Sequence, residues 1–148
     1  MKILLSIKPQ FVEKIKKGEK KFEFRRVLPR CQEVDTIIVY ASKPVGKVVG
    51  EISVAEYLTL TVEEMWDATK DISGLTREEF FNYFHGKKNA HAIAIESYRD
   101  YEQPIPLDVL FPNRVPPRSY CYLNGYEEWR ASKGARLLFC SNFQNKNK

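Results

Sequence analysis

The first 26 residues constrain the fold most, because they hold a strand, a helix and a second strand with sharp boundaries between them. Apolar side chains alternate at Ile3, Leu5 and Ile7, which is the period of an extended strand. Pro9 suits the first turn of a helix, where its missing N–H costs nothing. Gly18 suits the left-handed position that ends one. We therefore expect a strand over residues 1–8 and a helix up to residue 17.

The rest of the chain alternates between the two periods in the same way. Apolar alternation and β-branched residues predict strands over 21–26, 36–41, 47–57, 90–97 and 119–123. Capping boxes of the form S/T-x-x-E begin at Thr61 and Thr76 and predict helices near 62–69 and 77–85. Five prolines between 104 and 117 favour an irregular excursion there. This mixture predicts the α+β class, as a small, partly closed β-barrel with flanking helices.

Length and motif content exclude several classes of protein. A chain of 148 residues matches one domain. It has no apolar run of about 18 residues and no secretory leader, so we expect a cytoplasmic protein without a membrane span. Its cysteines form no CxxC pair and its two histidines lack ligand-spaced neighbours, so no metal site is expected. Walker A, G-x-G-x-x-G and G-x-S-x-G motifs do not occur, and no cofactor is expected.

The positive charge of the chain is concentrated near its N-terminus. Lysine and arginine number 24 against 19 acidic residues, a formal charge of +5. Eight of these basic residues lie between positions 14 and 30. Such a cluster favours a polyanionic partner, although a solvated helix face explains a run of this kind equally well.

One segment within this cluster carries a specific pattern. Residues 18–25 read G-x-K-x-x-E-x-R, directly after the predicted helix and entering a strand. Glu23 and Arg25 share a strand face, so they can form a charge-assisted pair, and the arginine fork suits a phosphate. Lys20 adds a mobile cation, and it can join Glu23 only if the chain is still turning after Gly18. The plain alternative is a surface ion-pair cluster worth ~0–1 kcal/mol.

The segment resembles the signature of the ASCH domain family, a branch of the PUA-like small barrels. Residues 40–44, where the third predicted strand ends, and residues 48–52 are also similar to that family. The resemblance covers residues 1–123 and leaves 124–148 as a C-terminal extension, partly frayed. It implies a cleft that binds RNA or another nucleobase-containing ligand. Its expected binding residues are Lys20, Lys21, Glu23, Arg25 and Lys43.

The resemblance also implies an alternative, and the residues leave open whether the protein is an enzyme. One family branch hydrolyses acetylated cytidine with a lysine that matches Lys20 and a threonine where this chain has Glu23. An acidic residue of that branch falls near Asp71. A glutamate cannot replace the hydroxyl nucleophile, but it can act as a general base on water. The alternative is therefore an amidohydrolase or a ribonuclease that uses Lys20 and Glu23, and a regulatory protein that binds a protein partner is a third class.

Overall fold

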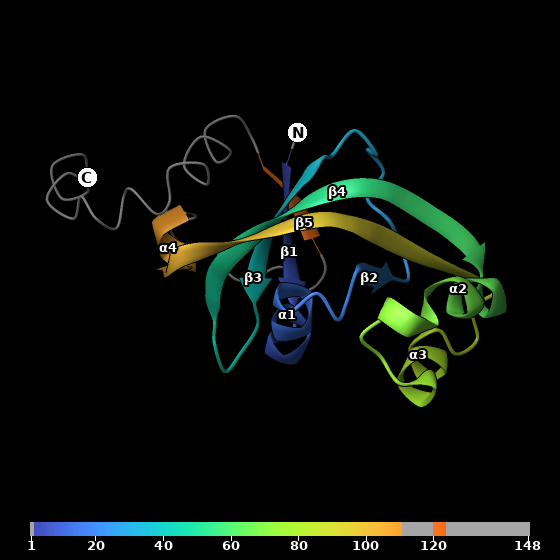
Figure 1. Ribbon diagram of the computed structural model, residues 1–148. Coiled ribbons are helices and arrows are strands. Elements are labelled where there is room, and N and C mark those ends of the chain that lie inside the picture. The colour runs from blue at the N-terminus through green and yellow to red at the C-terminus, as the bar shows by residue number, and fades with distance from the viewer. Residues whose placement is uncertain (1, 111–119, 124–148) are drawn as a thin grey trace, which may run out of the picture.

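The computed structural model describes residues 2–110 and 120–123 as a curved sheet with one helix, α1 (Pro9–Lys16), beneath its middle and the other helices at its two ends (Figure 1). The strands are β1 (Lys2–Ile7), β2 (Phe22–Arg25), β3 (Thr36–Ala41), β4 (Lys47–Thr61), β5 (Asn89–Pro106) and β6 (Tyr120–Tyr122). The helices are α1 (Pro9–Lys16), α2 (Val62–Thr69), α3 (Arg77–Tyr83) and α4 (Leu107–Leu110), with a 3-10 turn η1 (Lys70–Ile72). None of the helices in this part of the chain is long and apolar enough to cross a membrane.

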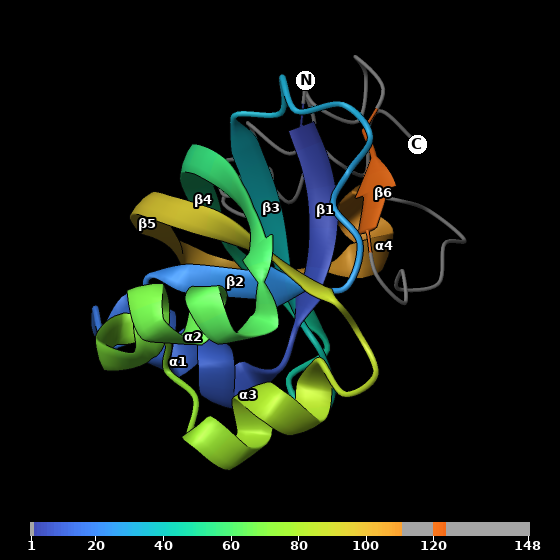
Figure 2. The same ribbon diagram turned by 90° about the vertical axis from the view of Figure 1, so that its right-hand side faces the viewer.

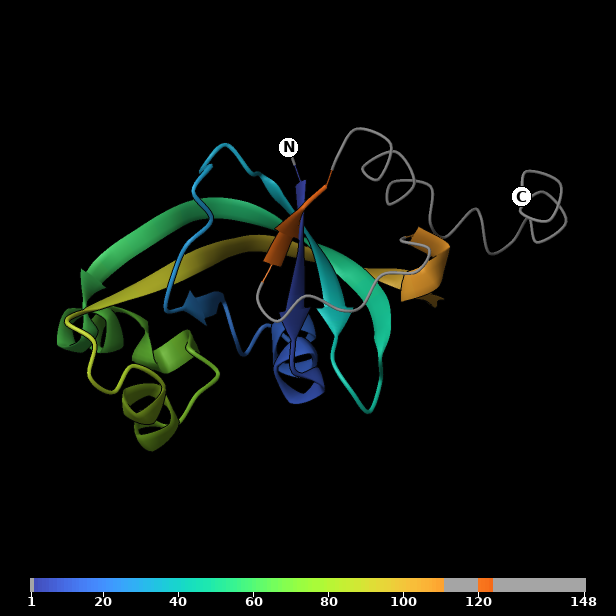
Figure 3. The same ribbon diagram turned by 180° about the vertical axis from the view of Figure 1, so that it is seen from behind.

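The sheet has the order β2-β5-β4-β3-β1-β6. β1 and β3 are parallel, and the other neighbours are antiparallel. β4 and β5 arch together over the molecule (Figure 1), and their register shifts in several places, as expected where bulges bend a ribbon. Seen from behind, β6 lies in front of β1 near the middle of the view (Figure 3) and pairs with it as the last strand of the sheet. The α+β class is confirmed, and among the described residues the sheet is curved but not closed into a barrel.

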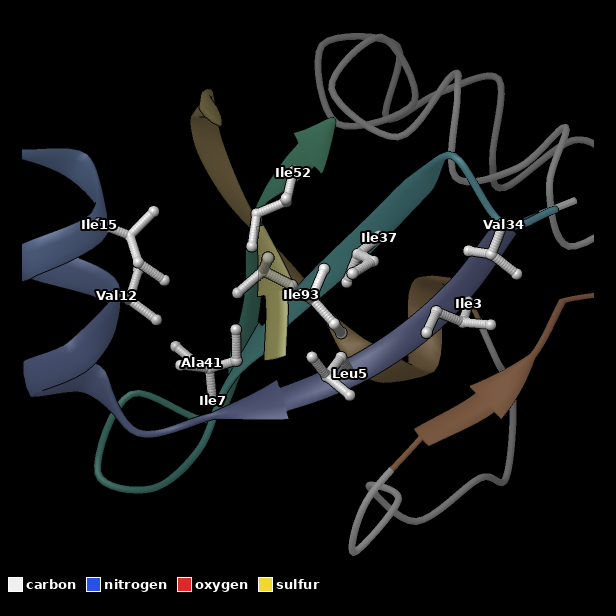
Figure 4. Packing of buried hydrophobic residues seen from close by; sticks show 11 residues of the cluster. Ile3, Leu5, Ile7, Val12, Ile15, Val34, Ile37, Ala41, Ile52 and Ile93 are labelled. Carbon is white, nitrogen blue, oxygen red and sulfur yellow. The ribbon is translucent and has the colours of Figure 1, made fainter. Parts of the chain in front are cut away.

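The main core lies between the sheet and α1. Ile3, Leu5 and Ile7 of β1 form one cluster with Val12 and Ile15 of α1 and with apolar residues of the neighbouring strands, and the end of β1 at Ile7 lies nearest to α1 (Figure 4). The intervening Leu4 is also buried, in a second cluster on the other face. β1 is therefore covered on both faces, which explains why its apolar run includes the residue that alternation alone would place in solvent.

An aromatic cap closes one end of the β4–β5 ribbon. It is built from α2, η1 and α3, and both predicted capping boxes form, at Thr61 and Thr76. Phe80 of α3 is fully buried at its centre. Its ring lies 5.2 Å from that of Phe24 and 5.1 Å from that of Trp66. Because Phe24 belongs to β2, this contact fixes the cap against the strand that carries the G-x-K-x-x-E-x-R segment.

The structure corrects one expectation about the chain's second half. The prediction of an irregular segment that begins at residue 104 is wrong for its first residues, because β5 continues to Pro106 and α4 follows directly. β2 pairs only with residues 91–94 among the described part of β5, so Pro104 and Pro106 lie where one edge of the strand is open. A missing N–H is tolerated at such an edge. Residues 111–117 and the expected extension 124–148 lie outside the described residues.

The aromatic cap predicts a test of stability. Phe80→Ala should lower the free energy of unfolding by about 3–5 kcal/mol, because it empties a fully buried ring position. Urea denaturation measures this change as a lower midpoint with an unaltered slope. Phe81→Ala is the matched control, since Phe81 is the neighbouring ring on the same helix and is only partly buried. Equal effects of the two changes would contradict the central position of Phe80.

Candidate functional site

A cavity of about 1170 Å³ opens where the β1–α1 junction, β2 and α3 meet. These three elements come from different parts of the sequence and adjoin at one end of the sheet (Figure 2). The cavity is lined on one side by Ser6, Lys8 and Phe11, and the turn after β3 adds Lys43. α3 contributes Glu79 and Tyr83. The remaining wall is β2 with its flanking residues, including Lys20, Glu23, Phe24 and Arg25.

Lys20 is buried at the floor of this cavity. Gly18 has a φ of 78°, so the chain is indeed still turning as it approaches β2. Lys20 then pairs with Ser73 in an isolated bridge, and its side chain is only 2% exposed. Its Nζ donates a hydrogen bond to the Ser73 carbonyl at 2.9 Å and lies 4.8 Å from the centre of the Phe24 ring.

The loop after η1 is shaped around this lysine. Gly74 has a φ of 72°, and a Cβ added there would lie 2.6 Å from the Cβ of Lys20. Only glycine therefore fits at this position without displacing the lysine. Lys14 of α1 donates to the Gly74 carbonyl at 2.9 Å. The loop thus binds both α1 and the residue that leads into β2.

Burial changes the acid–base behaviour of Lys20. The pKa of its ammonium is lowered from 10.5 to about 8, mainly by desolvation and to a smaller extent by the nearby positive charge of Lys14. The carboxylates of Glu23 and Glu79 oppose this shift. At neutral pH the group is mostly protonated, but it releases its proton far more easily than an ordinary lysine does.

Glu23 and Arg25 form the pair that their spacing predicts. The Arg25 guanidinium donates to the Glu23 carboxylate, with Nη1 and Oε2 3.3 Å apart. Their side chains are 13% and 9% exposed, for Arg25 and Glu23 respectively. A solvated surface pair is therefore ruled out, because both charges are largely withdrawn from water. The cavity lining thus includes a carboxylate that is paired with Arg25 and acts electrostatically on Lys20.

The other predicted residues divide into two groups. Lys43 lines the cavity together with Lys20, Glu23 and Arg25. Lys21 does not, because its side chain is exposed and its backbone bonds to Ile72 and Ile95. Asp71 is exposed on η1 and also lies outside the cavity lining. Within the part of the chain that the structure describes, no group of three or more His, Cys, Asp or Glu side chains can hold a metal ion.

The sequence analysis missed the contribution of α3 and of the residue after β2. Glu79 and Tyr83 line the cavity from α3, and Arg26 lines it beyond the end of β2. The capping box at Thr76 identified Glu79 only as the residue that completes a helix cap. No local pattern indicates which strand this helix packs against, because Arg26 and Tyr83 are 57 positions apart.

Comparison with known proteins identifies a matching family and several proteins of similar sequence. A family model described as the ASCH domain matches residues 5–135. An ASCH domain-containing ribonuclease of Zymomonas mobilis is 29% identical over 127 residues, which cover 84% of this chain and 85% of that protein. The ATP synthase subunit alpha of Ureaplasma parvum is 30% identical over 115 residues, 77% of this chain but only 14% of that protein.

A solved structure supports the same similarity at the level of the fold. The crystal structure of ASCH from Zymomonas mobilis matches with a TM-score of 0.80 and 26% sequence identity. The match covers 89% of this chain and 94% of that chain. The curved sheet and its cap are therefore those of a known architecture.

The pKa of Lys20 predicts a pH-dependent stability. Between about pH 8 and 10.5 the unfolded chain binds more protons at this site than the folded one, so stability rises with pH in that window. We expect the free energy of unfolding of the wild type, relative to Lys20→Met, to rise there by up to about 3 kcal/mol. Urea denaturation across the window measures it. Lys17→Met, which removes an exposed lysine, is the control, and a pH-independent difference for Lys20→Met would contradict the burial of the charge.

Proposed function

The chain belongs to the ASCH domain family, as residues 18–25 indicated, and on that premise we propose that its cavity binds a nucleotide of single-stranded RNA. The observation that carries the proposal is the set of buried Lys20, buried Glu23 and partly buried Arg25 at the floor of a cavity of about 1170 Å³. This set offers both signs of charge to one ligand. A role in RNA metabolism or in regulating transcription or translation is the corresponding biological proposal.

The shape and polarity of the cavity suit a nucleobase. Phe11, which is only partly buried, lines it with aromatic surface, on which the flat face of a base can pack. Glu23 is an acceptor, and a carboxylate there can bind the amino or imino N–H groups at the edge of a base. Arg25 already donates to one oxygen of this carboxylate, so a donor of the ligand would add a second hydrogen bond to a buried acceptor and favour bases that carry one.

The charge around the cavity suits the phosphate that such a base carries. Lys8 and Lys43 line it at the β1–α1 junction and after β3, in addition to the two cations of the floor. Arginine presents a fork that matches phosphate oxygens, and lysine a compact charge. The relative from Zymomonas mobilis that this chain matches over most of its length is named a ribonuclease, which supports RNA as the ligand class.

A second candidate function is RNA hydrolysis at the same place. The lowered pKa of Lys20, next to the Glu23 carboxylate, is the observation that favours it. In this reaction Glu23 accepts the proton of an attacking hydroxyl group, and that oxygen forms a bond to phosphorus. The P–O bond to the leaving oxygen breaks, and Lys20 donates the proton that this oxygen takes up.

The binding proposal predicts a salt-dependent affinity for a short single-stranded RNA. Binding should weaken steeply as salt rises, because phosphate contacts release counterions. Lys43→Ala should weaken it across all sequences and reduce the slope of log affinity against log salt by about one. Fluorescence anisotropy at several salt concentrations measures both. Lys87→Ala removes an exposed lysine outside the cavity and should change neither, whereas equal effects of the two variants would contradict phosphate binding at the cavity.

The hydrolysis proposal predicts turnover with a defined pH profile. Cleavage of a short RNA, followed by chromatography, should fall above about pH 8 as Lys20 loses its proton. Lys20→Met and Glu23→Gln should each lower the rate by about 100-fold or more, in the range of one lost acid or base. Acetylated cytidine is tested in the same assay, and its hydrolysis in place of RNA cleavage would indicate the amidohydrolase alternative. If RNA binds but neither substrate gives a product, the protein is a binding domain, and RNA hydrolysis as its function is excluded.

A further inference from the structure

Arg26 and Tyr83 form a stacked pair at the edge of the cavity. The Arg26 guanidinium carbon lies 4.1 Å from the centre of the Tyr83 ring. Its Nε donates a hydrogen bond to the Tyr83 carbonyl at 2.9 Å. One side chain follows β2 and the other ends α3, and both line the cavity. The guanidinium is therefore held in place by two contacts to the same residue.

This pair is accessible from the cavity, unlike the residues of the floor. Arg26 is exposed, whereas Lys20 is 2% exposed. Among the described residues no carboxylate lies within salt-bridge distance of Arg26. The next residue, Val27, also lines the cavity and is 66% exposed. A planar cation backed by an aromatic ring, next to an exposed apolar side chain, is a surface on which a base can stack.

The floor and the edge are far enough apart to hold different bases. The Cα atom of Arg26, the first residue after β2, follows that of Glu23 by three residues, which corresponds to roughly 10 Å of nearly extended backbone. The cavity volume of about 1170 Å³ exceeds the roughly 300–1,000 Å³ typical of pockets that hold one small molecule. A single nucleotide bound at the floor therefore leaves space at the edge for its neighbour.

We propose that Arg26, supported by Tyr83, is a stacking subsite for the nucleobase next to the one bound at the cavity floor. The ligand is then an RNA strand of at least two nucleotides rather than a free nucleoside. This inference rests on the proposed function, because it assumes that a nucleotide occupies the floor. It assigns Arg26 a specific action, stacking, which is distinct from the attraction of phosphate by charge.

The experiment compares adenosine 5′-monophosphate with the 5′-phosphorylated adenosine dinucleotide, using titration calorimetry on the full chain. The wild type should bind the dinucleotide more tightly than the mononucleotide. Arg26→Ala should lower dinucleotide affinity by about 10-fold, within the range measured for loss of one base stack. It should leave mononucleotide affinity within twofold. Arg26→Lys should show most of the same loss, because an ammonium group keeps the charge but offers no planar face.

The matched control is Arg77→Ala. Arg77 also stacks on an aromatic ring of α3, with its guanidinium carbon 4.6 Å from the Phe81 ring centre, but neither residue lines the cavity. This variant should bind both ligands as the wild type does. Thermal unfolding of each variant checks that the fold is retained, and Arg26→Lys serves if Arg26→Ala does not fold.

The outcomes separate the two proposals. If the wild type binds neither ligand, both the proposed function and the subsite are wrong. If it binds the two equally, or if Arg26→Ala weakens both to the same extent, only the subsite is overturned. Full dinucleotide affinity in Arg26→Lys would assign Arg26 to phosphate binding and would also overturn stacking.

Discussion

The buried ammonium group of Lys20 is the constraint on which the site depends. Removing a charge from water is costly, and the protein offsets this cost with the Ser73 carbonyl, the Phe24 ring and the nearby Glu23 carboxylate. The offset is incomplete, as the lowered pKa of the lysine indicates. An ammonium group held in this way lowers the free energy of unfolding, and it is well suited to ligand recognition or proton transfer. Its position also requires that the loop after η1 and the start of β2 form together.

The aromatic cap and the site are therefore one structural unit. Phe24 contacts Phe80 of the cap on one side and Lys20 on the other. Gly74 gives the loop the close approach that the lysine needs, and Lys14 binds the same loop from α1. Phe24 and the loop after η1 therefore connect the packing of the cap with the burial of the lysine. Stability and site chemistry are thus linked through the same few contacts.

Glu23 stands where the acetylcytidine-hydrolysing branch of the family has a threonine, so this chain cannot use the same hydroxyl nucleophile. A carboxylate held by Arg25 at 3.3 Å has no hydroxyl group with which to form an acyl intermediate. It can accept a hydrogen bond from a base or a proton from an attacking hydroxyl group. Under the proposed function, the carboxylate would therefore act on a base or on an attacking hydroxyl group of an RNA ligand.

The sequence by itself determined the features that depend on neighbours within a few positions. The bounds of α1 near Pro9 and Gly18, the capping boxes at Thr61 and Thr76, the Glu23–Arg25 pair and the family segment all have this local origin. Only the tertiary structure decided the partners of Lys20 and Arg26, which lie 53 and 57 positions away. It also showed that Lys21 lies outside the cavity and that β5 continues through its prolines. The physical reason is that periodicity and capping express interactions within one turn or one strand face. A cavity, in contrast, is made by contacts between elements that no local pattern pairs.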